Sequence, residues 1–212
     1  MIELHMSSGL PLRFSSIFWT NAEVQLGDRY AYFQSDVIIN ENGNGPQGIS
    51  VKIAARRDQT ELQPRHAYRI DGPVAVWGPH NKPILMEDFQ NTIEINHAEV
   101  RPNCLANKVL AQGLGRIVEW SRRETSGLPI EVIKVLHRCW NSTRTQRVDF
   151  HANYLLNTNI TSKFTMDALN VGNLISLRGR VVSFIDIHHI WEIEATEIPL
   201  ILTFPRIIED DM

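Results

Sequence analysis

Residues Leu174-Ile-Ser-Leu-Arg-Gly179-Arg-Val-Val-Ser-Phe184 alternate between apolar and polar side chains around a central glycine. A short turn follows, and then the run His189-Ile-Trp-Glu-Ile-Glu-Ala195. Alternation with a period of two is typical of a β-strand with one buried face. A glycine inside such a strand indicates a sharp bend or the close approach of another backbone. These residues therefore predict two successive strands, the first of them bent.

The same arrangement occurs once more in the first half of the chain. There Tyr68-Arg-Ile-Asp-Gly72-Pro-Val-Ala-Val-Trp77 precedes Pro83-Ile-Leu-Met-Glu-Asp88. Both pairs resemble the fourth and fifth strands of OB domains in the group of replication protein A and the single-stranded DNA-binding proteins. A chain of 212 residues is long enough for two domains of about 100 residues each. The repeated pattern favours that division.

Further alternating runs complete two sets of strands. In the first half they cover residues 30–39, 48–55, 67–77 and 83–95, with one more strand before them. Asn42-Gly43-Asn44-Gly45 separates the first two runs and predicts a hairpin. In the second half the runs cover residues 115–123, 131–140, 147–156, 173–185 and 189–199.

A short helix is expected within residues 161–170, capped by Thr161 or Thr165 and ended by Val171-Gly172. Three strands, a short helix and two strands is the order of an OB barrel. We therefore expect an all-β fold of two tandem five-stranded OB-like barrels, each with at most one short helix. The predicted parts are a first domain at 10–98, a linker at 99–112, a second domain at 113–205 and an acidic tail at 206–212. The first nine residues, either native or an expression leader, are excluded from the fold.

Composition limits the classes of function. Apolar residues make up 43% of the chain and charged residues 21%, which allows a real core. The sequence lacks an apolar run of membrane-spanning length, so an intracellular protein, nuclear or cytoplasmic, is expected. Cys104 and Cys139 are too few for a disulfide framework and are expected to be free.

Charge is unevenly distributed. The net charge of −3 argues against coating a nucleic acid through bulk charge. Residues 1–106 carry 9 Lys and Arg against 12 Asp and Glu, whereas residues 107–205 carry 11 against 9. Any nucleic-acid-binding surface must therefore be a local basic face, and the second half favours one.

Basic and aromatic residues gather on the predicted second and third strands of the second domain, the usual binding face of an OB barrel. Alternation places Lys134, Leu136, Arg138 and Trp140 on one side of a strand, opposite to His137 and its neighbours. Phe150 is expected in the core, and Trp140 is expected to be exposed. The candidate binding residues of this domain are Trp120, Arg122, Arg123, Lys134, Arg138, Trp140, Arg144 and Arg147.

The first domain offers a second, weaker surface. Lys52 and Arg56 share one side of a predicted strand, and Tyr30 and Tyr32 share one side of the strand before it. Because this half is net acidic, contact with a partner protein is an equally good interpretation.

Motifs of common enzymes are missing. The sequence has no P-loop, no Gly-x-Ser-x-Gly elbow and no His-Glu-x-x-His helix. His188-His189 beside Asp186 could suggest a metal, but adjacent strand residues face apart and a turn explains them more simply. We expect no catalysis, cofactor or metal.

The sequence predicts a protein that binds single-stranded DNA, or RNA, in DNA replication or repair. The alternative is a protein-interaction module or a subunit of a larger DNA-maintenance complex, with a partner protein or a second copy of the chain bound. Steep salt dependence of binding would favour nucleic acid.

Overall fold

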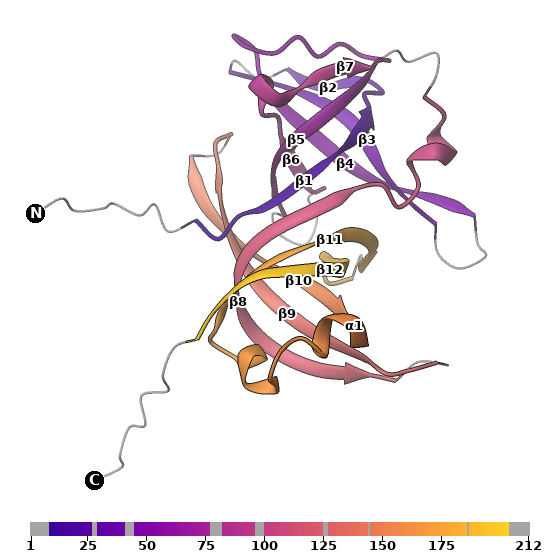
Figure 1. Cartoon of the computed structure of the whole chain (residues 1–212). Coiled ribbons are helices and arrows are strands. Elements are labelled where there is room, and N and C mark those ends of the chain that lie inside the picture. Colours follow the sequence, from indigo (N-terminus) through magenta and orange to yellow (C-terminus); the bar gives the residue numbers. More distant parts are fainter. Residues whose placement is uncertain are drawn as a thin grey trace, which may run out of the picture.

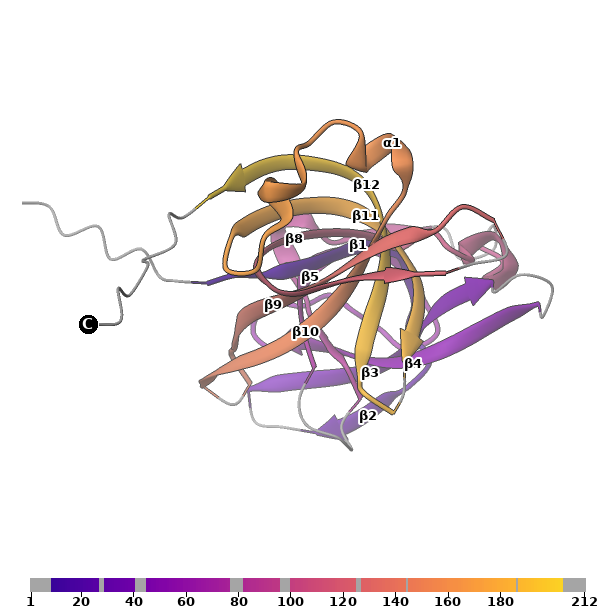
Figure 2. The same ribbon diagram turned by 90° about the horizontal axis from the view of Figure 1, so that it is seen from below.

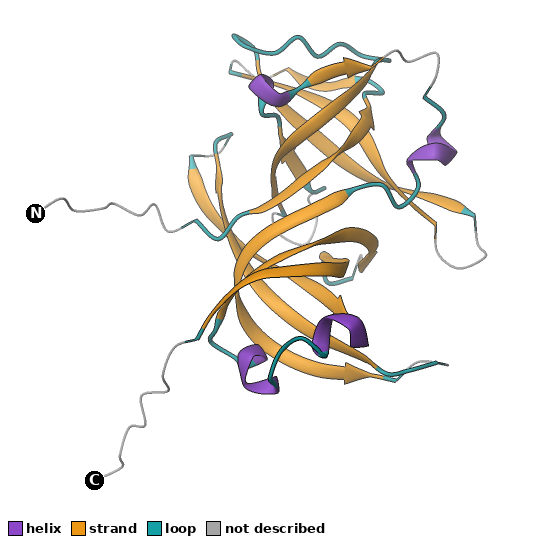
Figure 3. Cartoon of the chain, in the orientation of Figure 1, coloured by secondary structure: helices purple, strands orange, loops and turns teal. Residues whose placement is uncertain are grey.

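The computed structural model describes residues 9–26, 29–40, 45–76, 82–95, 100–124, 127–143, 145–185 and 187–203. Strands dominate these residues (Figure 3), and α1 (Thr158–Thr161) is the one α-helix among them. The predicted all-β class is therefore confirmed. Within the described part, no helix is long and apolar enough to cross a membrane.

The second half of the chain forms a closed five-stranded barrel. Its strands are β8 (Leu110–Arg123), β9 (Ile130–Asn141), β10 (Gln146–Leu156), β11 (Leu174–Ile185) and β12 (Ile190–Leu202). Antiparallel β8, β9 and β10 are followed by β12 parallel to β10, then by β11, which pairs back to β8. Helix α1 lies between β10 and β11 (Figure 1). This is the strand order of an OB barrel.

The first half repeats this order. Its strands are β1 (Leu12–Trp19), β2 (Glu23–Leu26), β3 (Tyr30–Asn40), β4 (Pro46–Arg56), β5 (Ala67–Ala75), β6 (Ile84–Met86) and β7 (Ile93–Ile95). Strand β3 pairs with β2 and β4, β6 runs parallel to β4, and β5 joins β6 to β1. Asn21 and Ala22, between β1 and β2, exchange backbone hydrogen bonds with Gln34 on β3 and so close the ring.

The predicted hairpin of the first barrel joins β3 to β4. Asn40 at the end of β3 lies opposite Pro46 at the start of β4. The turn residues 41–44, which include the predicted Asn-Gly pair, lie outside the described residues.

Two elements differ from the sequence prediction. The run at 83–95 is not one strand, because the 3-10 helix η1 (Phe89–Asn91) separates β6 from β7. Asp88 stabilises this break by accepting hydrogen bonds from the side-chain amide of Asn91 and the Thr92 hydroxyl. Helix α1 begins before the predicted range, because the side chain of Asn157 caps it at the backbone N–H of Ile160. The 3-10 helix η4 (Met166–Leu169), with Thr165 at its N-cap position, occupies the predicted region.

The two glycines of the repeated pattern have the same structural role. A Cβ on Gly72 would collide with the backbone oxygen of Met86, and a Cβ on Gly179 would collide with that of Glu194. In each barrel the glycine therefore lets the fifth strand pass close to the fourth. This requirement explains why both sequences place glycine at the centre of an apolar strand.

Strand β1 belongs to both barrels. It pairs with β5 along its whole length and with β8 through Leu12 to Ser15. Phe14 is buried, and its ring meets that of Trp191 edge-on, with centroids 5.2 Å apart. A side chain from the first sheet thus packs in the second barrel, and the sheet is continuous between them (Figure 2).

The connection between the barrels is shorter than predicted. Strand β8 begins at Leu110, inside the predicted linker 99–112, because residues 110–113 are paired on one side with β1 and on the other with β11. The 3-10 helix η3 (Pro102–Leu105) occupies part of the rest. The domain boundaries themselves stay a prediction.

A buried polar cluster attaches the N-terminal segment to the second barrel. His137 is fully buried, and its Nδ1 lies 3.0 Å from the backbone oxygen of Leu114 and 3.3 Å from that of Leu10. Its Nε2 lies 3.0 Å from the hydroxyl of Tyr154. Because carbonyls only accept, Nδ1 carries the proton and Nε2 accepts from Tyr154. Burial lowers the pKa of His137 to about 4, so the ring is neutral.

Candidate nucleic-acid interface

Strands β9 and β10 present one outward face to solvent. Along β9, Val135, His137 and Cys139 are buried, as the alternation predicted. Phe150 of β10 is also buried, as expected. The outward residues face one another in the register Lys134 with Asn153, Leu136 with His151, Arg138 with Asp149 and Trp140 with Arg147. Asn153 is the one buried member of this set. We call these eight residues the β9–β10 face.

Trp140 and Arg147 form its most accessible part. Trp140 is 54% exposed, as expected, and Arg147 directly opposite is also exposed. Within the described residues, Arg147 makes no hydrogen bond or ion pair through its side chain. An exposed indole beside an available guanidinium can accept both a base and a phosphate. Arg144, also predicted here, lies outside the described residues.

The other two cations of the face are paired with carboxylates. Arg138 donates from Nε and Nη2 to the two carboxylate oxygens of Asp149, each at 2.7 Å. This hydrogen bonding lowers the pKa of Asp149 and raises that of Arg138. Lys134 Nζ lies 2.6 Å from Oε2 of Glu119 on β8, and that hydrogen bond lowers the pKa of Glu119. The face is thus less positive than the count of its basic residues suggests.

Trp120 and Arg122 of β8 are not brought to this face, whereas Arg123, opposite Ile130, lies on the same side of the ribbon as Lys134. A bulge between Ile117 and Glu119 changes the register, so that Glu119 lies opposite Lys134 and Trp120 lies opposite Ile133. Trp120 is 46% exposed, but its side chain projects from the side of the strand opposite to that of Lys134.

The two arginines after Trp120 are paired with carboxylates. Arg122 lies 3.8 Å from Glu124 and 3.9 Å from Glu131. Arg123 donates to Glu192 on β12 at 2.6 Å. Their charges are therefore partly neutralised, and they lie apart from Trp140.

The sequence patterns alone did not single out Arg116. It is exposed, lies on β8 opposite Leu136, and has no ion pair within the described part of the chain. Its position beside the β9–β10 face depends on the β8–β9 register. The alternation of β8 indicated an outward side chain, but not which residue of β9 it would meet.

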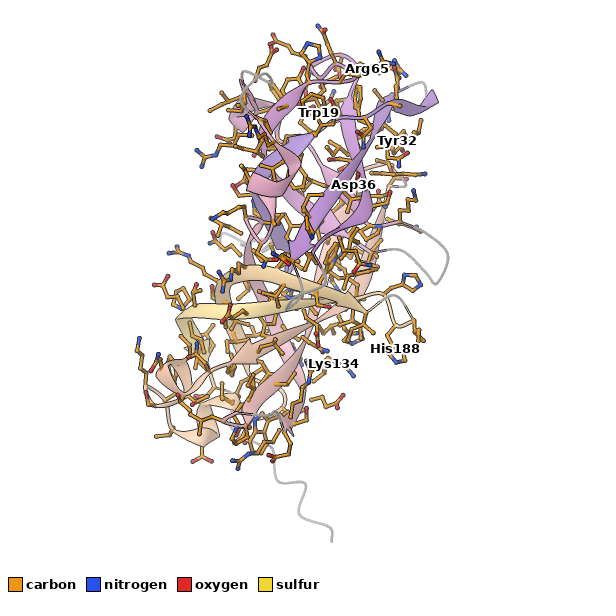
Figure 4. All side chains as sticks on the ribbon, turned by 90° about the vertical axis from the view of Figure 1, so that its right-hand side faces the viewer. Trp19, Tyr32, Asp36, Arg65, Lys134 and His188 are labelled. Carbon is orange, nitrogen blue, oxygen red and sulfur yellow. The ribbon has the colours of Figure 1, made fainter. Side chains whose placement is uncertain are left out.

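The first barrel has the equivalent surface on β3 and β4. Tyr30 and Tyr32 are half-buried and pack partly against the core, with ring centroids 6.5 Å apart, and Arg56 lies opposite Tyr30. Lys52 lies opposite Gln34 and is half-buried. In Figure 4, Tyr32 lies in the upper barrel and Lys134 lies in the lower barrel.

Alternative chemical sites receive little support. His188 and His189 lie in the turn between β11 and β12. Among the described residues, no three side chains of the metal-ligating types form a group. Cys139 is buried, and burial raises the pKa of its thiol to about 11, while Cys104 is exposed and free.

The strand order and the two glycine-bent strands define a chain of two OB barrels.

No protein-family model matches the sequence, and no curated protein sequence is significantly similar to it. Two solved structures of the single-stranded DNA-binding protein from Thermus aquaticus share the fold. The wild-type structure matches with a TM-score of 0.56 and 12% identity, covering 93% of this chain and 95% of that one. The structure of a deletion mutant of the same protein matches with a TM-score of 0.53 and 14% identity, over 95% of this chain and 99% of that one.

A replication protein A heterotrimer bound to single-stranded DNA is a weaker match, with a TM-score of 0.24 and 15% identity over 98% of this chain and 52% of that one. The two Thermus structures establish the fold. The likeness extends over both barrels, since the matched region covers nearly the whole of this chain.

Proposed function

We propose that the chain binds single-stranded DNA on the outward faces of its OB barrels, with the β9–β10 face as the main platform. The observation that carries the proposal is the exposed Trp140 directly opposite the exposed Arg147. These residues lie on the second and third strands of an OB barrel, where such barrels commonly bind oligonucleotides. The fold shared with single-stranded DNA-binding proteins supports the same function.

Stacking supplies the affinity that charge does not. A base stacked on an aromatic side chain contributes about 1–3 kcal/mol. Trp140 offers such a ring, and His151 and Leu136 extend the face along the strands. Since every base has an aromatic surface, this arrangement predicts binding with little sequence preference.

The salt dependence should be shallow. Arg147 and Arg116 are the cations of this region that form no ion pair in the described residues. Each phosphate contact on a single strand contributes about −0.7 to the slope of log K against log salt, so two contacts predict a slope of about −1.4. A much steeper slope would mean that the pairs of Arg138 and Lys134 open when DNA binds.

The test is fluorescence anisotropy of a labelled poly-pyrimidine strand about 30 nucleotides long, long enough to span two OB barrels. The protein is titrated at low and moderate salt, with a duplex of the same length as the control. Micromolar or tighter binding to the single strand, weaker for the duplex, is the expected result. No binding at low salt would contradict the proposal.

One observation favours a second candidate function, the binding of a partner protein. Strand β12 pairs with β10 only as far as Glu194, while its pairing with β11 continues to Leu202. The remaining edge of β12 is therefore open in the described part, and Leu200 and Leu202 beside it are exposed. Such an edge can accept a strand from a peptide or a second copy of the chain. Association that persists at high salt would support this alternative.

A further inference from the structure

A cavity lies at one end of the first barrel, apart from the β9–β10 face. Its volume is about 470 Å³, and it is lined by Arg29, Tyr30, Arg56, Arg57 and Asp58. The start of β3 and the end of β4 meet here, because the backbone N–H of Arg57 donates to the backbone oxygen of Arg29 at 3.1 Å. The volume is within the range of small-molecule sites.

The cavity is cationic. Among the described lining residues three guanidinium groups face one carboxylate, and Glu23 beside Arg57 adds a second, so these five groups carry a net charge of about +1. Asp58 holds Arg56 through two hydrogen bonds at 3.1 and 2.7 Å. Glu23 outside the lining holds Arg57 at 2.6 Å. These pairs hold two of the guanidinium groups at the cavity.

Donors remain for an anion. A guanidinium has five N–H donors, and the two bonds from Arg56 to Asp58 use only part of that set. Arg29 is exposed and has no ion pair within the described part of the chain. The planar arrangement of these donors matches the oxygens of a phosphate.

An aromatic ring borders the same cavity. Tyr30 lies directly opposite Arg56 across β3 and β4, and the ring of Tyr32 follows at 6.5 Å. A phosphate held by the arginines would thus be next to a surface on which a base can stack. Phosphate-binding cations beside a stacking ring indicate a nucleotide rather than a simple anion.

We propose that this cavity binds the terminal phosphate of a DNA single strand, with the adjoining base on Tyr30. A terminal phosphate monoester presents three unesterified acceptor oxygens, one more than an internal diester, and can therefore accept from more of the remaining donors of Arg29 and Arg56. The inference deepens the proposed function, on which it rests, by assigning an end-recognition site to the first barrel.

The experiment compares three labelled thymidine oligonucleotides of equal length: one with a 5′-phosphate, one with a 3′-phosphate and one with neither. The full chain should bind one phosphorylated strand about tenfold more tightly than the unphosphorylated one, as charge-assisted hydrogen bonds of this kind imply. The double variant Arg29→Gln, Arg56→Gln should lose that preference. Arg69→Gln, an exposed charge on β5, is the matched control and should keep it.

Equal affinity of the wild-type protein for all three strands would overturn the proposal, because the arginines would then contact internal phosphates only. If no oligonucleotide binds, the proposed function fails. Calorimetry with thymidine 5′-monophosphate and with thymidine then tests separately whether the cavity binds a phosphate. Binding of the monophosphate alone, lost in the variant, supports the cavity, and no binding overturns it. The single variant Arg29→Gln, an exposed position, replaces the double variant if the latter is unstable.

Discussion

Asp149 accepts two hydrogen bonds from the guanidinium of Arg138, both at 2.7 Å, across the β9–β10 strand pair. The carboxylate occupies the donors that a DNA phosphate would use and adds a negative charge to the face. We therefore expect Asp149→Asn to bind single-stranded DNA several-fold more tightly and to steepen the salt slope by about 0.7, the effect of one more phosphate contact. Anisotropy titrations at a series of salt concentrations measure both quantities.

The matched control is Glu197→Gln on β12, which frees Arg178 on β11 and changes the net charge by the same amount. It should leave affinity nearly unchanged. Equal tightening by both variants would mean that only net charge matters, and that the β9–β10 face has no special role.

Trp140 and Trp120 have similar exposure, but their side chains project from opposite sides of the sheet. Trp140→Ala should weaken binding by about 1–3 kcal/mol through loss of base stacking, and Trp120→Ala should have a much smaller effect. The measurement compares the dissociation constants of the two variants for the same oligonucleotide. A larger effect at Trp120 would restore the interpretation from sequence that this residue belongs to the platform.

Phe14 connects the stability of the two barrels. Because its ring packs against Trp191 in the second barrel, Phe14→Ala should lower the free energy of unfolding by about 3–5 kcal/mol. Denaturant unfolding should remain a single transition, since β1 pairs with strands of both barrels. Phe89→Ala, at an exposed position, should cost less than about 1 kcal/mol. Two separate transitions, only one of them shifted by Phe14→Ala, would contradict this coupling.

His137 should make the protein sensitive to acid. Its pKa is about 4 in the folded chain and 6.5 ordinarily, so the unfolded state binds more protons between these values. Its contribution to stability is therefore complete above about pH 6.5 and is lost as the pH falls toward 4. From this group alone, the free energy of unfolding should be about 2 kcal/mol lower near pH 5 than near pH 7.5.

Urea unfolding at the two pH values measures the difference. His137→Gln should reduce the pH dependence by that amount, whereas His188→Gln, in the exposed turn, should leave it unchanged. An unchanged dependence in His137→Gln would show that the histidine is not the responsible group.

Local patterns predicted the strands well because each depends on a few neighbouring residues. Alternation on β9 identified the buried and outward sides correctly, and Gly72 and Gly179 indicated where two strands approach closely. The sequence also predicted correctly that Phe150 is buried and that Trp140 is exposed. These features follow from side-chain period and backbone sterics, which the sequence carries directly.

Relationships between strands could not be predicted in the same way. The pairing of Arg138 with Asp149 depends on the β9–β10 register, and the position of Trp120 depends on a bulge in β8. The sharing of β1 by both barrels depends on contacts far apart along the chain. Counting basic residues along the sequence therefore overestimated the charge that the β9–β10 face has available for a ligand.

The most direct test of the β9–β10 face is a map of backbone amide shifts in the nuclear magnetic resonance spectrum as an unlabelled single strand is added. The largest shifts should fall on Trp140, Arg147 and their neighbours on β9 and β10, with the indole N–H of Trp140 moving and that of Trp120 remaining in place. Shifts confined to β11 and β12, with Trp140 unaffected, would contradict the assignment of DNA binding to this face.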